Sequence, residues 1–252
     1  MRSIKTSGIV IKRINLGEAD RLLTIYTAEV GKVRAIAKGS RRTLSKLAGH
    51  LEPLSLTIFE LHEGKSFFVI TSADLVAGFM GIQNDLEKTS LAFYLLEMVD
   101  VLTTHDHAHD AIFDLLRDGL TLLEQPAETV GTRLFVVAFM LKLLAEVGYL
   151  PELSRCVNCQ KSLMPAGNYF SPSLGGIIDP SCRQEASDRL KVSSTSIKAM
   201  RLFLSSSLSV VYRCTLSPEV LDELEYIIES NLQYHVGREL YSKTFVMKIA
   251  NG

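Results

Sequence analysis

The stretch at residues 31–42 reads Gly31-Lys32-Val33-Arg34-Ala35-Ile36-Ala37-Lys38-Gly39-Ser40-Arg41-Arg42. Basic side chains at positions 32, 34 and 38 are separated by apolar ones, and a Gly-Ser turn signal ends the run. Successive side chains of a strand point to opposite faces. An extended conformation would therefore collect four alternate residues on one face: Lys32, Arg34, Ile36 and Lys38. We predict a β-strand at 32–37, followed by a basic loop.

Four more β-rich runs flank this strand, at residues 8–14, 22–27, 54–61 and 67–72. Turn signals separate them at 15–17, 29–31, 39–40 and 63–64. Five short strands in about 75 residues are typical of a small barrel, and the OB-fold is a five-stranded barrel that binds oligonucleotides. An SH3-like barrel fits the same pattern, so the spacing leaves both open.

The hydrophobic period changes to a helical one from about residue 84. Helical faces follow at residues 86–98, 112–123, 134–147 and 193–204. The sequence Ser217-Pro218 is typical of an N-cap with proline in the first turn, and it predicts one more helix. The fold class predicted is therefore α+β and multidomain. We expect a small β-barrel at 1–80 and an all-α domain at 81–252, with an insert of different composition at 152–182.

Charge is distributed unevenly along the chain. The 252 residues are 47% hydrophobic, enough for more than one core, and the net charge is -1. Residues 1–50 carry eleven Lys or Arg against three Asp or Glu, which leaves them at +8 and the rest at -9. Such asymmetry predicts a unit that binds a polyanion, attached to an acidic body.

No targeting or membrane-spanning segment is evident in the sequence. The first residues lack the apolar core of a signal peptide. The most apolar stretch, at residues 134–147, contains Lys142 and Glu146 and is too short to cross a bilayer, so it is read as a buried helix. We expect a cytoplasmic protein without membrane partners. In a reducing compartment the four cysteines indicate metal before disulfide.

The candidate nucleic-acid site is the basic segment. Flexible cations around a barrel groove are what binding the phosphates of a strand requires. The predicted DNA-binding residues are Arg13, Lys32, Arg34, Lys38, Arg41, Arg42 and Lys46. Aromatic side chains at Tyr26, Phe59, Phe67 and Phe68 could offer stacking surfaces, although each taken singly is better read as core. The alternative is a solvated strand edge, where charge blocks aggregation.

The candidate metal site lies in the insert. Cys156-Val157-Asn158-Cys159 forms one CxxC pair, and Asp179-Pro180-Ser181-Cys182 has the spacing of a second pair with Asp in the first position. Cys156, Cys159 and Cys182 with the Asp179 oxygen could complete a zinc tetrahedron, although structural sites are usually built from Cys and His. The alternative is a degenerate finger that folds without metal.

No catalytic motif supports an enzyme. Gly64-Lys65-Ser66 is read as a hairpin turn, because the upstream glycine of a phosphate-binding loop is absent. The alternating histidines at 105, 107 and 109 join two helical patterns and are read as a solvated loop. Two alternatives stay open: a metal-dependent nuclease or other DNA-processing enzyme, and a structural zinc-ribbon protein of the RNA machinery.

At these motifs the chain resembles the RecO family of bacterial DNA repair proteins. The segments that carry the resemblance follow the order of the family along nearly the whole chain: 8–13, 17–24, 31–42, 47–53, 94–100, 148–151, 156–159, 169–172 and 175–176. The sequence departs from the family pattern at Asp179, where many members carry cysteine.

The resemblance implies that the barrel at 1–80 is a DNA-binding OB-fold, followed by a helical domain with a zinc-finger-like insert. It also implies a non-enzymatic recombination mediator that binds single- and double-stranded DNA, anneals complementary strands and, with RecR, helps load RecA onto coated strands. A further implied partner is the acidic tail of single-stranded-DNA-binding protein, which would need an apolar pocket rimmed by cations. Lys142 is one cation in the expected domain.

Overall fold

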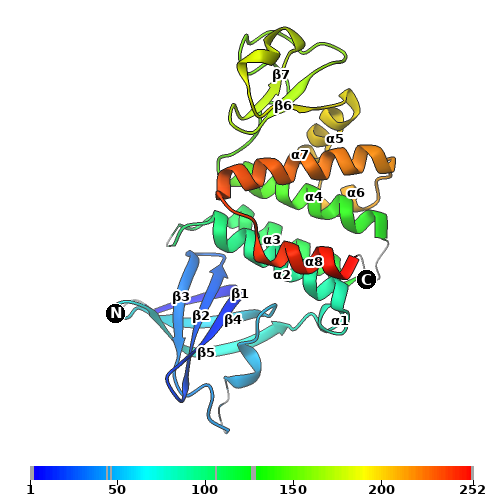
Figure 1. Cartoon of the computed structure of the whole chain (residues 1–252). Coiled ribbons are helices and arrows are strands. Elements are labelled where there is room, and N and C mark those ends of the chain that lie inside the picture. The colour runs from blue at the N-terminus through cyan, green and yellow to red at the C-terminus, as the bar shows by residue number, and fades with distance from the viewer. Residues whose placement is uncertain (1–2, 44, 46, 106, 126–128, 251–252) are drawn as a thin grey trace. The chain divides into compact units, whose positions relative to one another are not determined.

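The structure is a computed structural model that describes residues 3–43, 45, 47–105, 107–125 and 129–250 (Figure 1). The chain forms two compact units, residues 1–125 with 242–252 and residues 126–241. Each unit is described by itself.

The first unit is built on a closed barrel of five strands in the order β1-β2-β3-β5-β4. The strands are β1 (Ser3–Leu16), β2 (Asp20–Thr27), β3 (Gly31–Ala37), β4 (Leu56–His62) and β5 (Phe68–Ala77). β1 pairs antiparallel with both β2 and β4, whereas β3 and β5 pair in parallel. The closed, OB-like barrel confirms the predicted fold class, and the strand near residues 32–37 is where the sequence placed it.

The barrel interior is filled by alternate apolar residues of each strand. Val33, Ala35 and Ala37 of β3 point inward, and the largest core side chain is the fully buried Phe59 of β4. Gly8 makes room for that ring, because a Cβ at Gly8 would lie 2.6 Å from Ile25 and 3.1 Å from Phe59. The alternation that fills the interior therefore also decides which side chains lie outside.

Helices complete the first unit. They are the 3₁₀ turn η1 (Ala48–His50), α1 (Met80–Gln83), α2 (Leu86–Leu102), α3 (Asp110–Glu124) and α8 (Tyr241–Ala250), which joins this unit from Ser242 onward. The Asp85 side chain caps α2 by accepting the N–H of Lys88. Glu124 accepts the N–H groups of Gly81 and Ile82, and so fastens α1 to the end of α3.

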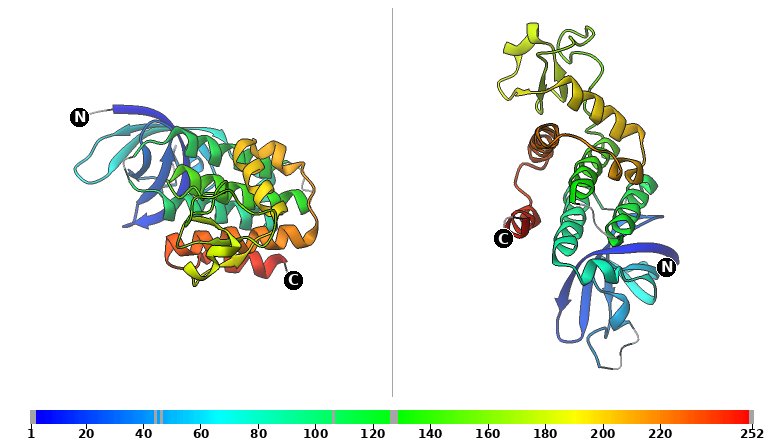
Figure 2. Two further views of the ribbon diagram at one scale, coloured as in Figure 1. Left: turned by 90° about the horizontal axis from the view of Figure 1, so that it is seen from above. Right: turned by 90° about the vertical axis from the view of Figure 1, so that its right-hand side faces the viewer.

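The second unit is a helical core with a small sheet beyond it. Its helices are α4 (Thr129–Glu146), α5 (Ser194–Ser205), α6 (Leu208–Tyr212) and α7 (Pro218–Val236), and Figure 2 shows α4 beside α5, α6 and α7. The apolar stretch of α4 is buried almost throughout, as predicted. Pro218 begins α7, and Gly237 ends it in a left-handed conformation, as a C′ glycine commonly does.

The cysteine-containing insert folds as a three-stranded sheet in the order β7-β6-β8. It comprises β6 (Tyr169–Ser171), β7 (Gly176–Ile178), β8 (Leu190–Lys191) and the 3₁₀ turn η2 (Pro180–Glu185). The Asp188 carboxylate accepts from the Ser171 hydroxyl at 2.6 Å and from the Ser173 N–H at 2.8 Å. The ordered sheet thus extends past residue 182. No helix among the described residues has the length and apolar content needed to cross a bilayer.

Candidate nucleic-acid surface and metal centre

The outer face of β3 and the loop after it carry the exposed cations. Arg34 and Lys38 are exposed because their neighbours Val33 and Ala37 point into the barrel. Arg41 and Arg42 are exposed in the following loop, and the predicted Lys46 lies outside the described residues. The loop is anchored at Arg41, whose N–H donates to the Ala19 carbonyl and whose Nη1 donates to the Gly17 carbonyl, both at 2.9 Å.

Lys32 shares this outer face but is covered. It is only 5% exposed, and its ammonium donates to the backbone carbonyl of Asp100 at the end of α2 and lies 3.3 Å from the Asp100 carboxylate. The backbone carbonyl of Lys32 is also 3.2 Å from His105 Nδ1. Lys32 thus holds β3 against the end of α2, and the Asp100 carboxylate neutralises its charge.

Arg13 is half-buried and paired. Its guanidinium forms an ion pair with Glu52, and Arg21 approaches the other oxygen of the same carboxylate at 3.4 Å. One acidic side chain therefore lies between two cations on the barrel surface. Since the pair is partly exposed, salt and solvent screen it and a phosphate can compete for either cation.

A groove next to Arg34 combines cations with aromatic rings. It has a volume of about 430 Å³ and is lined by residues of β3, the β4–β5 turn and the segment after α2: Arg34, Glu63, Gly64, Lys65, Ser66, Phe67, Phe68 and His105. Phe67 and Phe68 are half-buried, which leaves part of each ring at the surface. Cations beside accessible rings are the combination that single-strand binding uses. The β4–β5 turn confirms that Gly64-Lys65-Ser66 belongs to a hairpin.

The other candidate aromatics are core residues. Phe59 is fully buried, and Tyr26 is 1% exposed. Burial, with a smaller contribution from the Asp110 charge, raises the pKa of Tyr26 to about 12. Neither ring is placed to stack on a base.

Three thiols of the insert converge. The Sγ atoms of Cys156, Cys159 and Cys182 all lie within 4.8 Å of one another, and no other group of three or more such ligands occurs in the part of the chain that the structure describes. Cys156 is fully buried, with Ile178 and Ala186 packed beside it. Three thiolates at this spacing fit the donor set of a structural zinc ion, for which sulfur is a preferred ligand.

The carboxylate of Asp179 is engaged elsewhere. It is the N-cap of η2, where Oδ1 accepts from the Ser181 N–H at 2.9 Å and from the Ser181 hydroxyl at 2.6 Å. These bonds lower the pKa of Asp179. Its oxygens are not within the three-thiol group, whereas its backbone N–H donates to Cys156 Sγ at 3.3 Å. Asp179 therefore supports the cluster through its backbone.

The environment of the thiols favours a thiolate at Cys156. Burial raises the pKa of Cys156, but backbone N–H groups led by that of Asp179 outweigh it and lower the pKa overall. The pKa of Cys159 is lowered by the Lys161 N–H, yet burial and the neighbouring sulfurs raise it overall. Cys214, the fourth cysteine, lies just after α6 and donates to the Val210 carbonyl, outside the group.

Lys142, predicted as a cation of the helical domain, is half-buried on α4. Its ammonium donates to the Leu204 carbonyl at 3.2 Å, and burial lowers its pKa. Lys65 and His105 are the basic groove residues that the sequence analysis did not select for the nucleic-acid surface. The hairpin signal around Lys65 could have indicated that residue. No signal indicated His105, because the sequence does not show that the segment after α2 reaches β3.

Two family models match the chain. Residues 1–79 match the N-terminal domain of recombination protein O, and residues 83–244 match its C-terminal domain. These matches cover the barrel, the insert and the helices from α2 to α7.

Curated relatives match over most of their length. A protein of Dehalococcoides mccartyi named DNA repair protein RecO is 36% identical over 235 residues, covering 93% of this chain and 91% of the relative. Proteins of the same name from Roseiflexus and Thermoanaerobacter are 32% and 28% identical, covering 97% and 100% of this chain and 85% and 100% of theirs.

Proposed function

Because the chain belongs to the RecO family of DNA repair proteins, with a role in DNA repair and recombination, we propose that it binds DNA and anneals complementary single strands. The observation that supports this most is the outer face of the barrel, where Arg34, Lys38, Arg41 and Arg42 are exposed. We assign residues 1–80 as the DNA-binding domain, and residues 81–252 as the helical domain with its insert at 152–182.

Annealing follows from charge neutralisation. Two strands repel each other through their phosphates, and bound cations release counterions and lower that repulsion. Contacts must also be weak enough to release the duplex. Exposed side chains such as Arg42 fit this need, because each interacts with a phosphate in high dielectric. The groove at Arg34 and Phe68 would hold a base and a phosphate of the same strand.

Annealing makes and breaks no covalent bond, and we propose that the protein is not an enzyme. Annealing should require no ATP, since duplex formation is thermodynamically favourable. By its family, we propose that the protein acts with RecR to load RecA onto strands coated by single-stranded-DNA-binding protein, whose acidic tail it would bind. We place this activity in the cytoplasm at the nucleoid.

We propose that the three-thiol group holds a structural zinc ion. Cys156, Cys159 and Cys182 would be ligands, and zinc would supply cross-linking of the insert without any catalytic step. The fourth ligand predicted at Asp179 stays a prediction. The hydrogen bonds of its Oδ1 to Ser181 leave Oδ2 as the oxygen that would have to turn toward the sulfurs.

The test is an annealing assay on complementary strands coated with single-stranded-DNA-binding protein, without nucleotide. We expect duplex formation to accelerate with the protein and to be unaffected by ATP. Strict dependence on hydrolysable ATP would contradict the proposal. Cleavage of labelled DNA in the presence of magnesium or manganese would favour the nuclease alternative, provided that the cleavage activity co-purifies with the protein.

A further inference from the structure

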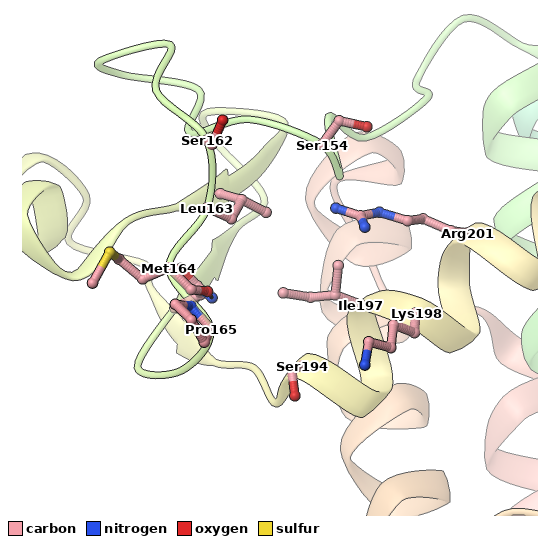
Figure 3. A pocket seen from close by; sticks show the side chains of 10 residues that line it. Ser154, Ser162, Leu163, Met164, Pro165, Ser194, Ile197, Lys198 and Arg201 are labelled. Atoms are coloured by element: carbon pink, nitrogen blue, oxygen red, sulfur yellow. Dashed lines mark hydrogen bonds between the residues drawn. The ribbon is translucent and has the colours of Figure 1, made fainter.

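Cations line two hollows of the described structure, one in each unit, and the two hollows differ in one kind of side chain. Figure 3 shows the pocket between α5 and the loop at 162–168, which is lined by Lys198 and Arg201 and by no histidine. The groove at Arg34, in the other unit, is lined by His105 as well as by cations. Histidine is the side chain whose charge commonly changes between pH 5 and 8. Of the two hollows, only the groove gains charge when a histidine is protonated.

The backbone on both sides of His105 is fixed against the start of β3. Lys32 and His105 form a parallel β-bridge, and the Lys32 ammonium donates to the Asp100 carbonyl at the end of α2. Gly31 lets the two segments approach closely, because a Cβ at this position would overlap the His107 carbonyl oxygen. His105 therefore projects from a segment that is attached to the barrel before and after it.

One hydrogen bond also fixes the tautomer of the imidazole. His105 Nδ1 lies 3.2 Å from the Lys32 carbonyl oxygen, which only accepts hydrogen bonds, so Nδ1 carries the proton in the neutral ring. The other nitrogen, Nε2, then holds the lone pair that takes up a further proton. His105 is exposed, so that proton comes directly from solvent. Protonation therefore leaves the anchoring bond in place and adds one positive charge to the groove.

That added charge is large compared with the charge of the groove itself. Besides His105, the lining holds two cations and one carboxylate, which leave a charge of +1, and protonation of the ring makes it +2. Lys32 adds nothing to this sum, because the Asp100 carboxylate neutralises it. The charged and titratable groups around the ring are Lys32 and Arg34 of β3, Asp100 of α2, Glu63 and Lys65 of the β4–β5 turn, and His107 of the same segment.

We propose that His105 is a phosphate-binding residue of the groove, and that its Nε2 takes up a proton when a DNA strand binds. This inference rests on the proposed function, in which the groove holds a base and a phosphate of one strand. A phosphate close to the ring favours the charged imidazole, because an opposite charge stabilises it. Linkage is reciprocal, so a strand that favours the protonated ring binds more tightly once the ring is protonated. Affinity for DNA should therefore rise as the pH falls from 8 to 6.

The test compares binding of labelled oligo(dT), whose bases do not titrate in this range, at pH 8 and pH 6. Wild type should bind about threefold to tenfold more tightly at pH 6, with a salt slope larger by about one, as gain of one phosphate contact requires. His105→Asn should abolish both differences and bind at pH 6 as wild type binds at pH 8. The Asn amide N–H can still donate to the Lys32 carbonyl, so this variant removes the titrating group and keeps the anchor.

Two further variants and one direct measurement keep the test independent of a single substitution. His107→Asn is the matched control, because His107 is exposed on the same segment but does not line the groove, and it should keep the full pH dependence. His105→Lys supplies a permanent charge and should bind at pH 8 about as tightly as wild type binds at pH 6. In NMR spectra at pH 7, the ring signal that is missing from His105→Asn should move toward its protonated position when oligo(dT) is added.

Several outcomes would overturn the proposal. Equal affinities of wild type at the two pH values, or the same pH dependence in wild type and His105→Asn, would show that the ring does not bind a phosphate. Loss of the pH dependence in His107→Asn would assign it to the wrong histidine, and a ring signal that does not respond to oligo(dT) would exclude proton uptake. In all of these cases wild type still binds DNA, and the proposed function stands. Wild-type protein that binds no strand at either pH would remove both.

Discussion

The barrel and the cysteine insert reach a fixed structure by different means. The barrel buries ten or so apolar side chains around Phe59 and closes on itself, so its stability comes from its own core. In the insert, the buried cluster around the thiols has three members, Cys156, Ile178 and Ala186. Phe170 and Ile177 are also buried, in a sheet whose strands have only two or three residues. So small a core needs cross-links or polar contacts.

Because of this difference, DNA binding and folding stability depend on different parts of the molecule. Since the barrel core lies inside, its outer cations can change without loss of the fold. In the insert, the thiols are core side chains and candidate zinc ligands at once, so metal binding and stability depend on the same residues. Changes in the insert should therefore alter stability first, and changes on the barrel surface should alter DNA affinity first.

The largest effect expected is on the thiol cluster. Cys156→Ser removes the fully buried sulfur that all parts of the cluster surround, and a structural zinc site couples metal binding to folding. We expect zinc to fall from about one per chain to a small fraction, and the melting temperature to fall by about 5 °C or more. Metal analysis and thermal melting of protein purified without chelator measure both.

The matched control is Cys214→Ser, which changes a cysteine outside the cluster and should retain zinc. Asp179→Cys should tighten zinc retention against a chelator by supplying a fourth thiolate. Asp179→Asn keeps a capping side chain, so unchanged retention in that variant would show that the carboxylate is no ligand. Substoichiometric zinc in wild type, with Cys156→Ser harmless, would show a finger that folds without metal.

The next effect concerns the barrel surface. Replacing Arg41, Arg42 and Lys46 by Ala should lower the affinity for single-stranded DNA about tenfold to a hundredfold and reduce its salt slope by about two. The barrel should melt close to wild type, because Arg41 and Arg42 are exposed, the backbone bond of residue 41 to Ala19 is kept, and only the side-chain bond to the Gly17 carbonyl is lost. Fluorescence anisotropy over a range of salt measures this. An unchanged slope and affinity would move the DNA site elsewhere.

A smaller and opposite effect is expected at Glu52, which pairs with Arg13 and Arg21. Glu52→Gln removes the competing carboxylate, and we expect DNA affinity to rise about threefold. Glu60→Gln makes the same charge change on an exposed residue of β4. An equal gain in both variants would attribute the effect to net charge and not to release of Arg13.

The smallest effect is the acid sensitivity of the insert. Burial opposes ionisation of Asp188, but its bonds with Ser171 and Ser173 outweigh burial and lower its pKa. A lowered folded-state pKa gives stability that is present above the unfolded pKa, about 3.9, and is lost as pH falls through the folded value. Asp188→Asn should lower the melting temperature by about 3 °C at pH 7, and this difference should shrink below pH 4.

The control for this prediction is Glu185→Gln, an exposed carboxylate of the insert. It should melt like wild type at both pH values. A difference between Asp188→Asn and wild type that stays constant down to pH 3 would mean that the carboxylate does not contribute through its charge.

The sequence by itself determined the barrel strands, the long helices and the outward face of β3. Alternation in a strand and the helical period report which side chains share a face, and Val33, Ala35 and Ala37 point inward as that rule requires. The CxxC spacing likewise brought Cys156 and Cys159 together, because four residues of one turn cannot separate far.

Only the tertiary structure decided what covers those faces. Periodicity does not show that the end of α2 lies over Lys32, that Glu52 reaches Arg13, or that His105 reaches the groove at Arg34. Nor could it show that Asp179 bonds to Ser181 while Cys182 joins the other thiols. These contacts depend on where distant segments meet, and a local pattern carries no information on the packing that brings them there.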